Sequence, residues 1–395
     1  MVLLKTSTLT SAQSLYFGYP KSKTRGNKMR PKTRSWIAVL AMAITSTCFA
    51  QPEELTPEEQ AYKDSIKALN QENAAVASSQ EAYNKGIEMF EKKQYGGAIE
   101  QFRKSIQFDP NFTAAYYNKG VAENQDEQYD DAVKSMDRLI ALKPGYSKAY
   151  FQRGRAYQGL DNFLNAEQDY RQSLKLDATN PKAHYNFGTL RFLQQDYEGA
   201  VASFTKAIEF NKDDVNALND RGSSYRMLGN YPKAIADYEE AVRKNPKLAF
   251  VLNNIGTTKS KMKDYPGALA AFNRAISVDA NFHLAFNNRG VVQLGQGRLD
   301  DAVKDFDKAL ALEANYAPAA SNLSGVYFKK KDYKKALDMA NKAIKMDENN
   351  AAAYVNRGNA KEMLRDMDGA CDDWYKAKEL GSEQGKNYYA GNCGN

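Results

Sequence analysis

The sequence has 395 residues, and its 55 lysines and arginines outnumber its 48 aspartates and glutamates, for a formal net charge of +7. The excess lies at the N-terminus, because residues 1–50 contain eight basic side chains and no acidic one, which leaves 47 basic against 48 acidic residues in 51–395. The charge of the longer part therefore argues against nucleic acid as a partner.

Residues 29–50 have the three-part layout of a secretory signal peptide. A short basic run begins at Met29, an uncharged apolar run follows over 36–44, and mostly small residues lead to Ala50. The apolar run is too short to span a bilayer, so we expect no transmembrane segment in the mature chain. We expect cleavage after Ala50 and a periplasmic or secreted protein, with a lipid anchor at Cys48 as the alternative.

This layout makes residues 1–28 an upstream extension or a disordered one, and it leaves open whether Met1 or Met29 is the true start. Residues 51–78 are predicted to form an N-terminal capping helix. Thr56 is a helix-capping residue, and proline and two glutamates follow it in the first turn. Tyr62, Ile66 and Leu69 form an apolar stripe along this helix, which we expect to cover the start of the next segment.

A period of 34 residues then runs from 79 to 384, nine times, without an insertion or deletion. Counted from residue 79, place 20 of every repeat is alanine, place 8 is glycine in eight repeats, and place 24 is aromatic in seven. Small residues at places 8 and 20 allow two antiparallel helices to approach closely, and place 24 lies one turn beyond place 20 on the same face. Repeat 8 departs most, with Ser324 and Ala340 at places 8 and 24.

This pattern resembles the tetratricopeptide repeat family over 306 of the 395 residues. The resemblance implies an all-α fold, a right-handed α-solenoid superhelix of nine helix-turn-helix repeats. It further implies that the first helix of each repeat lines a concave groove and that the second faces outward. Residues 385–395 are then a C-terminal cap and tail, which the exposed end of an array needs.

Two cysteines remain beyond residue 50, Cys371 and Cys393. In an oxidising compartment an even pair at short sequence range predicts a disulfide, which here would fasten the C-terminal cap to repeat 9. Two reduced, buried thiols are the alternative.

Comparison of the nine repeats with one another predicts an ion pair. Place 7 is arginine and place 23 is aspartate in repeats 3, 5, 7 and 9, and in no other repeat. Positions that change together are usually in contact, so we predict a structural pair between the two helices of each of these repeats, which excludes the four arginines as anion-binding residues. The pairs are Arg153 with Asp169, Arg221 with Asp237, Arg289 with Asp305, and Arg357 with Asp373.

Places 5 and 6 are predicted to line the groove. Place 5 is aromatic in repeats 1–4 and polar in repeats 5–8, and place 6 is asparagine in seven repeats. A row of carboxamides can pair with the backbone of an extended peptide whatever its sequence. The row of asparagines resembles the asparagine ladder in the repeats of a protein glycosyltransferase. The alternatives are asparagines that bridge neighbouring helices and aromatics that pack between repeats. The candidate residues are Asn84, Asn118, Asn186, Asn254, Asn288, Asn322 and Asn356, with Tyr83, Tyr117, Phe151 and Tyr185.

No catalytic chemistry is expected. The only histidines, His184 and His283, stand at different places of the repeat, and the sequence has no metal-ligand spacing, phosphate-binding glycine loop or nucleophile elbow. The lysine at place 5 that marks carboxylate-clamping repeats of this family is also missing. We therefore predict neither a cofactor nor a metal, and no small-molecule ligand.

The leading prediction is a protein–protein interaction scaffold or adaptor that binds extended peptide segments in the groove. One alternative is a glycan or cell-wall binding module in which groove tyrosines stack on sugar rings. The other is a structural subunit of an envelope complex. Partner, pathway and oligomeric state have no signal in the sequence.

Overall fold

The computed structural model describes residues 56–393. The predicted signal peptide at 29–50, the lipid-anchor alternative at Cys48 and the choice between Met1 and Met29 all fall outside this range. The chain divides into two units, residues 1–67 and 68–395, and all nine repeats belong to the second.

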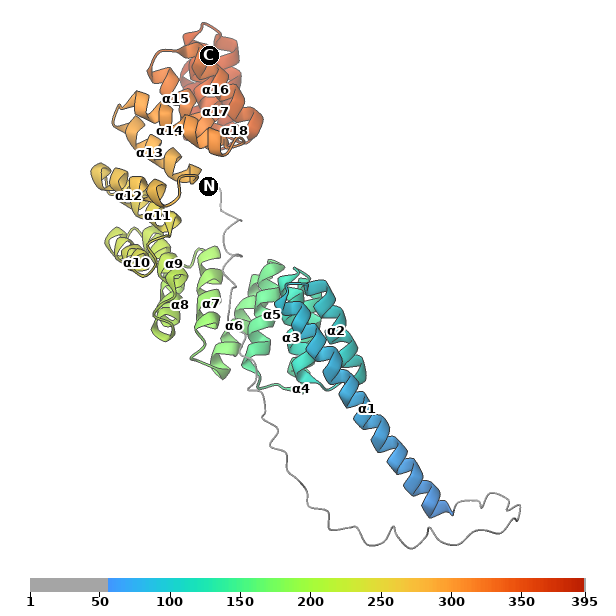
Figure 1. Cartoon of the computed structure of the whole chain (residues 1–395). Helices are drawn as coiled ribbons and strands as arrows, with labels where there is room; N and C mark the ends of the chain where they lie inside the picture. Colours follow the sequence, from blue (N-terminus) through green and yellow to red (C-terminus); the bar gives the residue numbers. More distant parts are fainter. Residues whose placement is uncertain (1–55, 394–395) are drawn as a thin grey trace. The chain divides into compact units, whose positions relative to one another are not determined.

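Residues 56–393 fold into nineteen α-helices and no strands, which confirms the all-α prediction (Figure 1). The helices are α1 (Pro57–Glu91), α2 (Tyr95–Phe108), α3 (Thr113–Gln125), α4 (Tyr129–Leu142), α5 (Ser147–Gly159), α6 (Phe163–Leu176), α7 (Pro181–Leu193), α8 (Tyr197–Phe210), α9 (Val215–Met227), α10 (Tyr231–Lys244), α11 (Ala249–Lys261), α12 (Tyr265–Val278), α13 (His283–Gly295), α14 (Leu299–Leu312), α15 (Ala317–Lys329), α16 (Tyr333–Met346), α17 (Ala351–Met363), α18 (Met367–Glu379) and α19 (Glu383–Asn392).

Each repeat is one helix-turn-helix unit. Helix A covers places 1–13 and helix B begins at place 17, so the odd-numbered helices α3 to α17 are A helices and the even-numbered helices are B helices. Helices A and B of one repeat contact each other, and each B helix contacts the next A helix. A helices of neighbouring repeats also touch, as α11 does α13 and α15 does α17. The predicted 34-residue pairing of helices is therefore confirmed.

Close packing inside a repeat depends on the glycine at place 8. A Cβ added at Gly86 would lie 2.6 Å from the ring of Phe102, and one added at Gly358 would lie 2.6 Å from Trp374 Nε1. The aromatic side chain at place 24 thus occupies the space that a larger residue at place 8 would need. In repeat 8 both places are small, and Ser324 Oγ donates a hydrogen bond to the carbonyl of Ala336 at 2.7 Å instead.

The N-terminal helix differs from the prediction. Thr56 and Glu59 form a reciprocal capping box, with Thr56 N–Glu59 Oε2 at 3.0 Å and Glu59 N–Thr56 Oγ1 at 3.3 Å. From there α1 continues without a break into helix A of repeat 1, because no glycine or proline interrupts residues 58–85. Its stripe is exposed rather than buried as a capping surface: Tyr62 is 71%, Ile66 41% and Leu69 53% exposed.

The C-terminal end is closed as expected. Helix α19 follows repeat 9, and a disulfide joins Cys371 of α18 to Cys393 at the end of α19. The ring of Tyr388 in α19 lies 5.5 Å from the fully buried ring of Trp374. No helix among residues 56–393 combines the length and the hydropathy that a membrane span needs.

Candidate functional site

The place-7 arginines each bind the aspartate of their own repeat with two parallel hydrogen bonds. In repeat 3, Arg153 Nε and Nη2 donate to the two carboxylate oxygens of Asp169, both at 2.8 Å. The aspartates are buried, with exposed fractions of 3 to 7%. The same fork joins Arg221 to Asp237, Arg289 to Asp305, and Arg357 to Asp373.

Each of these arginines also makes a contact that the repeat comparison did not predict. The third guanidinium nitrogen, Nη1, donates to the side chain at place 25 of the preceding repeat. The sequence did contain a signal for this contact: place 25 carries a side chain with an oxygen atom in all four even repeats. The acceptors are Asp137 at 2.6 Å, Thr205 at 3.2 Å, Asn273 at 2.6 Å and Asn341 at 3.0 Å.

The place-6 asparagines of repeats 6–9 form a row of bridges between A helices. Each side-chain amide donates to the residue at place 5 of the repeat before it, at 2.9 Å in all four cases. We call these four asparagines the carboxamide row. Its bridges join Asn254 to Asn219, Asn288 to Asn253, Asn322 to Asn287, and Asn356 to the carbonyl of Ser321.

The bridging role that the sequence left open is therefore present in the structure. It does not use up the side chains, because a carboxamide has two N–H donors and an oxygen with two lone pairs, and each bridge takes a single N–H. Asn288 Oδ1 in addition accepts from Asn287 Nδ2 at 3.3 Å. The bridges thus fix the orientation of the row and leave polar atoms of Asn254 and Asn322 without a partner in the described residues.

The remaining predicted asparagines lie in repeats 1, 2 and 4. Asn118 donates to the Tyr83 hydroxyl at 2.7 Å, across repeats 2 and 1. Asn84 accepts from Gln80 at 2.9 Å within its own helix. Asn186 donates to the carbonyl of Lys182, also in its own helix, at 2.9 Å. Asn118 therefore makes the same place-6 to place-5 bridge as the row, with a tyrosine as its acceptor, whereas Asn84 and Asn186 bond within their own helices.

The place-5 aromatics of repeats 1–4 pack between helices. Phe151 is 7% exposed, and the Tyr83 ring lies 4.9 Å from Phe112. The rings of Tyr117 and Tyr185 pack in the same way, 5.6 Å from Tyr146 and 5.7 Å from Phe204. This packing weighs against flat stacking of sugar rings on these side chains.

At place 6 of repeat 5 an aspartate stands where the row would have asparagine. Asp220 accepts hydrogen bonds from the Tyr185 hydroxyl at 2.8 Å and from Asn219 Nδ2 at 2.9 Å. Desolvation raises the pKa of the Asp220 carboxyl to about 6, and these two hydrogen bonds act against the rise. The row therefore meets a weakly acidic carboxyl group on its N-terminal side.

Polar aromatics at place 24 reach from helix B to polar residues of helix A. This contact was also missed, although the repeats with tyrosine or tryptophan at place 24 carry a hydrogen-bonding residue at place 9 or 12. The contacts join Tyr170 to Gln158 at 2.7 Å, Tyr238 to Ser223 at 3.1 Å, and Trp374 to Asn359 at 2.9 Å.

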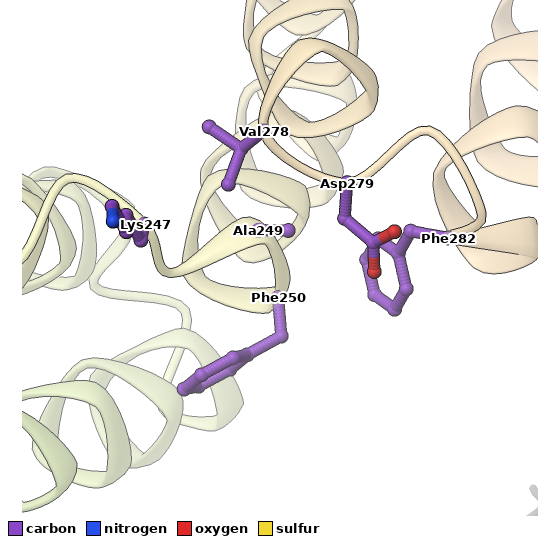
Figure 2. A pocket seen from close by; sticks show the side chains of 6 residues that line it. All are labelled: Lys247, Ala249, Phe250, Val278, Asp279 and Phe282. Carbon is purple, nitrogen blue, oxygen red and sulfur yellow. The ribbon is translucent and has the colours of Figure 1, made fainter.

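A hollow lies where repeat 6 begins and ends (Figure 2). Phe250, which lines it, precedes Asn254 of the row by one turn of α11. Phe250 at place 2 of α11 is 40% exposed, and Phe282 and Val278 contribute further apolar surface. Lys247 and Asp279 supply its charged groups. The apolar part of this lining suits an apolar side chain.

Both histidines serve packing. The His184 ring stacks on Phe210 at 5.7 Å, and its Nε2 lies 2.9 Å from the carbonyl of Ala178. The His283 ring lies 4.9 Å from Tyr316. Within residues 56–393 no three His, Cys, Asp or Glu side chains are grouped so as to hold a metal ion.

Repeated helix pairs, packed through small residues that recur at the same places, define a helical repeat protein. Tetratricopeptide repeat models match residues 86–126, 113–146, 147–180, 181–214, 215–248, 282–349 and 324–382. The chain belongs to the tetratricopeptide repeat family, whose repeats generally serve as interaction scaffolds.

Two solved structures are similar in fold. A tetratricopeptide repeat protein from Parabacteroides merdae ATCC 43184 is 20% identical, with a TM-score of 0.53, over 62% of this chain and 97% of that one. The C-terminal part of a TPR repeat-containing protein from Cytophaga hutchinsonii is 17% identical, with a TM-score of 0.50, over 61% of this chain and 98% of that one. At these identities the likeness shows the fold alone. Among curated proteins, none matches this chain.

Proposed function

We propose that this protein is a scaffold or adaptor that binds extended segments of other proteins along its A helices. The A face is the side of these helices that carries places 2, 5, 6, 9 and 12. The observation that carries the proposal is the carboxamide row, in which bridges hold the asparagines in one orientation while leaving polar atoms for a partner.

The row suits a peptide backbone better than a particular sequence. Neighbouring packed helices lie about 10 Å apart, and an extended chain advances about 3.3 Å per residue, so about three peptide residues span one repeat. Carboxamides can both donate to peptide carbonyls and accept from peptide N–H groups. The hollow at Phe250 adds a position for an apolar side chain of the bound segment (Figure 2).

Substitution of the row tests the site. The full chain with Asn254→Ala, Asn288→Ala and Asn322→Ala is expected to bind a fluorescent neutral 12-residue peptide at least tenfold more weakly in anisotropy titrations, because about three backbone hydrogen bonds are lost. Asn186→Ala is the matched control, since Asn186 bonds only within its own helix. Melting curves must show that the triple variant stays folded. Unchanged peptide affinity in a folded triple variant would refute the ladder.

We also propose that the protein is exported. The basic–apolar–small order of residues 29–50 supports this, as does the Cys371–Cys393 disulfide, because disulfides persist in oxidising compartments. N-terminal sequencing of the protein from producing cells is expected to begin at Gln51. A lipid-modified Cys48 at the N-terminus would instead support the anchored alternative, and an uncleaved Met29 would contradict export by this signal.

A further inference from the structure

Arg155 lies on the A face of repeat 3 without a carboxylate to balance its charge. It is partly buried at place 9 of α5, and its Nη1 donates to Gln152 Oε1 at 3.2 Å. Over residues 56–393 it forms no ion pair, unlike Arg153 two positions earlier, which Asp169 neutralises. A guanidinium keeps its proton in a protein, so this partly buried charge can pair with an anion from another molecule.

Polar groups of two A helices surround this arginine. Asn124 of α3 is 4% exposed, and its Nδ2 donates to Gln152 at the carbonyl oxygen, 2.9 Å, and at Oε1, 3.3 Å. Asn124 Oδ1 is buried and has no hydrogen-bond partner in the described residues. Burial raises the pKa of Tyr117, and a hydrogen bond with Gln152 and the charge of Arg155 act against that rise. These four residues are the Arg155 cluster.

We propose that the Arg155 cluster binds a carboxylate side chain of the extended segment held on the A face. The inference rests on the proposed function and names its partner class: protein segments with aspartate or glutamate in the part that lies over repeats 2–4. A guanidinium presents five N–H donors in a planar fork that matches a carboxylate, and the bond to Gln152 occupies a single one.

The position of the cluster supports a peptide as the source of the carboxylate. Gln152 stands at place 6 of repeat 3, in line with the asparagines of the carboxamide row in later repeats. The surrounding charge is also suitable: Lys148 and Lys182 are exposed at place 2 of repeats 3 and 4. Places 2, 5, 9 and 12 contain no aspartate or glutamate in repeats 1–8. A bound acidic segment over repeats 2–4 would therefore meet cations at these places. The one acidic residue at the A-face places of repeats 1–8, Asp220 at place 6, belongs to repeat 5.

Two fluorescent 12-residue peptides test this on the full chain. They have the same sequence except for glutamate or glutamine at three alternating positions. We expect the glutamate peptide to bind about tenfold more tightly, as for a hydrogen bond to a charged group, and the preference to shrink as salt is raised. Arg155→Gln is expected to remove most of the preference, with the part due to Lys148 and Lys182 remaining, while leaving binding of the glutamine peptide unchanged. Arg138→Gln, at an exposed position of the B helix α4, is the charge-matched control and should keep it.

The outcomes separate this inference from the proposed function. Equal binding of the two peptides to the wild-type chain would overturn the carboxylate site while the carboxamide row stands. A preference that is as large in Arg155→Gln as in the wild type would also overturn it. Binding of neither peptide would overturn both proposals. If Arg155→Gln melts far below the wild type, Arg155→Lys replaces it, and we then expect a reduced preference, because lysine cannot form the bidentate fork.

Discussion

Arginine at place 7 holds three acceptor oxygens at once, two on the aspartate of its own repeat and one on the repeat before it. In repeat 7, Arg289 donates to Asp305 at 2.7 and 2.6 Å and to Asn273 at 2.6 Å. The aspartate is 5% exposed, so a missing arginine would leave a carboxylate buried without a counter-ion. Replacing both residues of such a buried ion pair by apolar residues changes the free energy of unfolding little, whereas removing one residue alone lowers it strongly.

The even repeats supply the replacement that tests this. Arg289→Ala alone is expected to lower the free energy of unfolding by about 3 kcal/mol, because the Asp305 carboxylate stays buried and unpaired. The double variant Arg289→Leu with Asp305→Met copies the Leu323 and Met339 of repeat 8 and should recover most of that loss. Urea unfolding measures both. A double variant as unstable as the single one would show that the charge is not the cause.

At the scale of helices, the arginine contacts divide the array into pairs of repeats. The bridges to place 25 join repeats 2 to 3, 4 to 5, 6 to 7 and 8 to 9. At the junctions between these pairs, place 7 instead holds Phe187, Ile255 or Leu323, all nearly fully buried. Polar and apolar junctions therefore alternate along the A and B helices, with a period of two repeats.

The last helix offers a test of its own. Trp374 is fully buried beneath Tyr388 of α19, and it is the single tryptophan beyond residue 50. Reduction of the Cys371–Cys393 disulfide should loosen α19, since a disulfide of this loop length contributes about 3 kcal/mol. We expect Trp374 fluorescence to shift to longer wavelength on reduction, and the same shift in Cys393→Ser without reductant. An unchanged spectrum would mean that α19 stays docked without the bond.

Periodicity predicted the helices well because the residues that pack helix A against helix B lie within the same repeat. Glycine at place 8 and the aromatic at place 24 meet within one repeat, so their spacing alone placed helices A and B. Covariation between places 7 and 23 likewise identified both residues of a direct contact. The role of residues 57–78 was predicted less well, because an apolar stripe such as Tyr62 and Ile66 does not indicate whether another part of the chain covers it.

Contacts between repeats were the other part that the pattern did not determine. Place 6 reads as asparagine whether it faces a ligand or a neighbouring helix, and only the structure shows the bridge from Asn288 to Asn253. The Arg289–Asn273 bond was missed for the same reason, since place 25 varies even among the four even repeats, where it is aspartate, threonine or asparagine. Contacts between residues of different repeats can be predicted only when the way in which the repeats stack in three dimensions is known.

At the scale of the whole molecule, we propose that the A face recognises the backbone of an extended chain. The most direct measurement compares binding of one neutral 12-residue peptide with that of the same peptide N-methylated at alternate residues, by anisotropy on the full chain. N-methylation removes backbone N–H donors and leaves the side chains unchanged. We predict that affinity falls at least tenfold, because the asparagine oxygens of the row lose their donors. Equal affinity for the two peptides would contradict backbone recognition and leave side-chain contacts as the basis of binding.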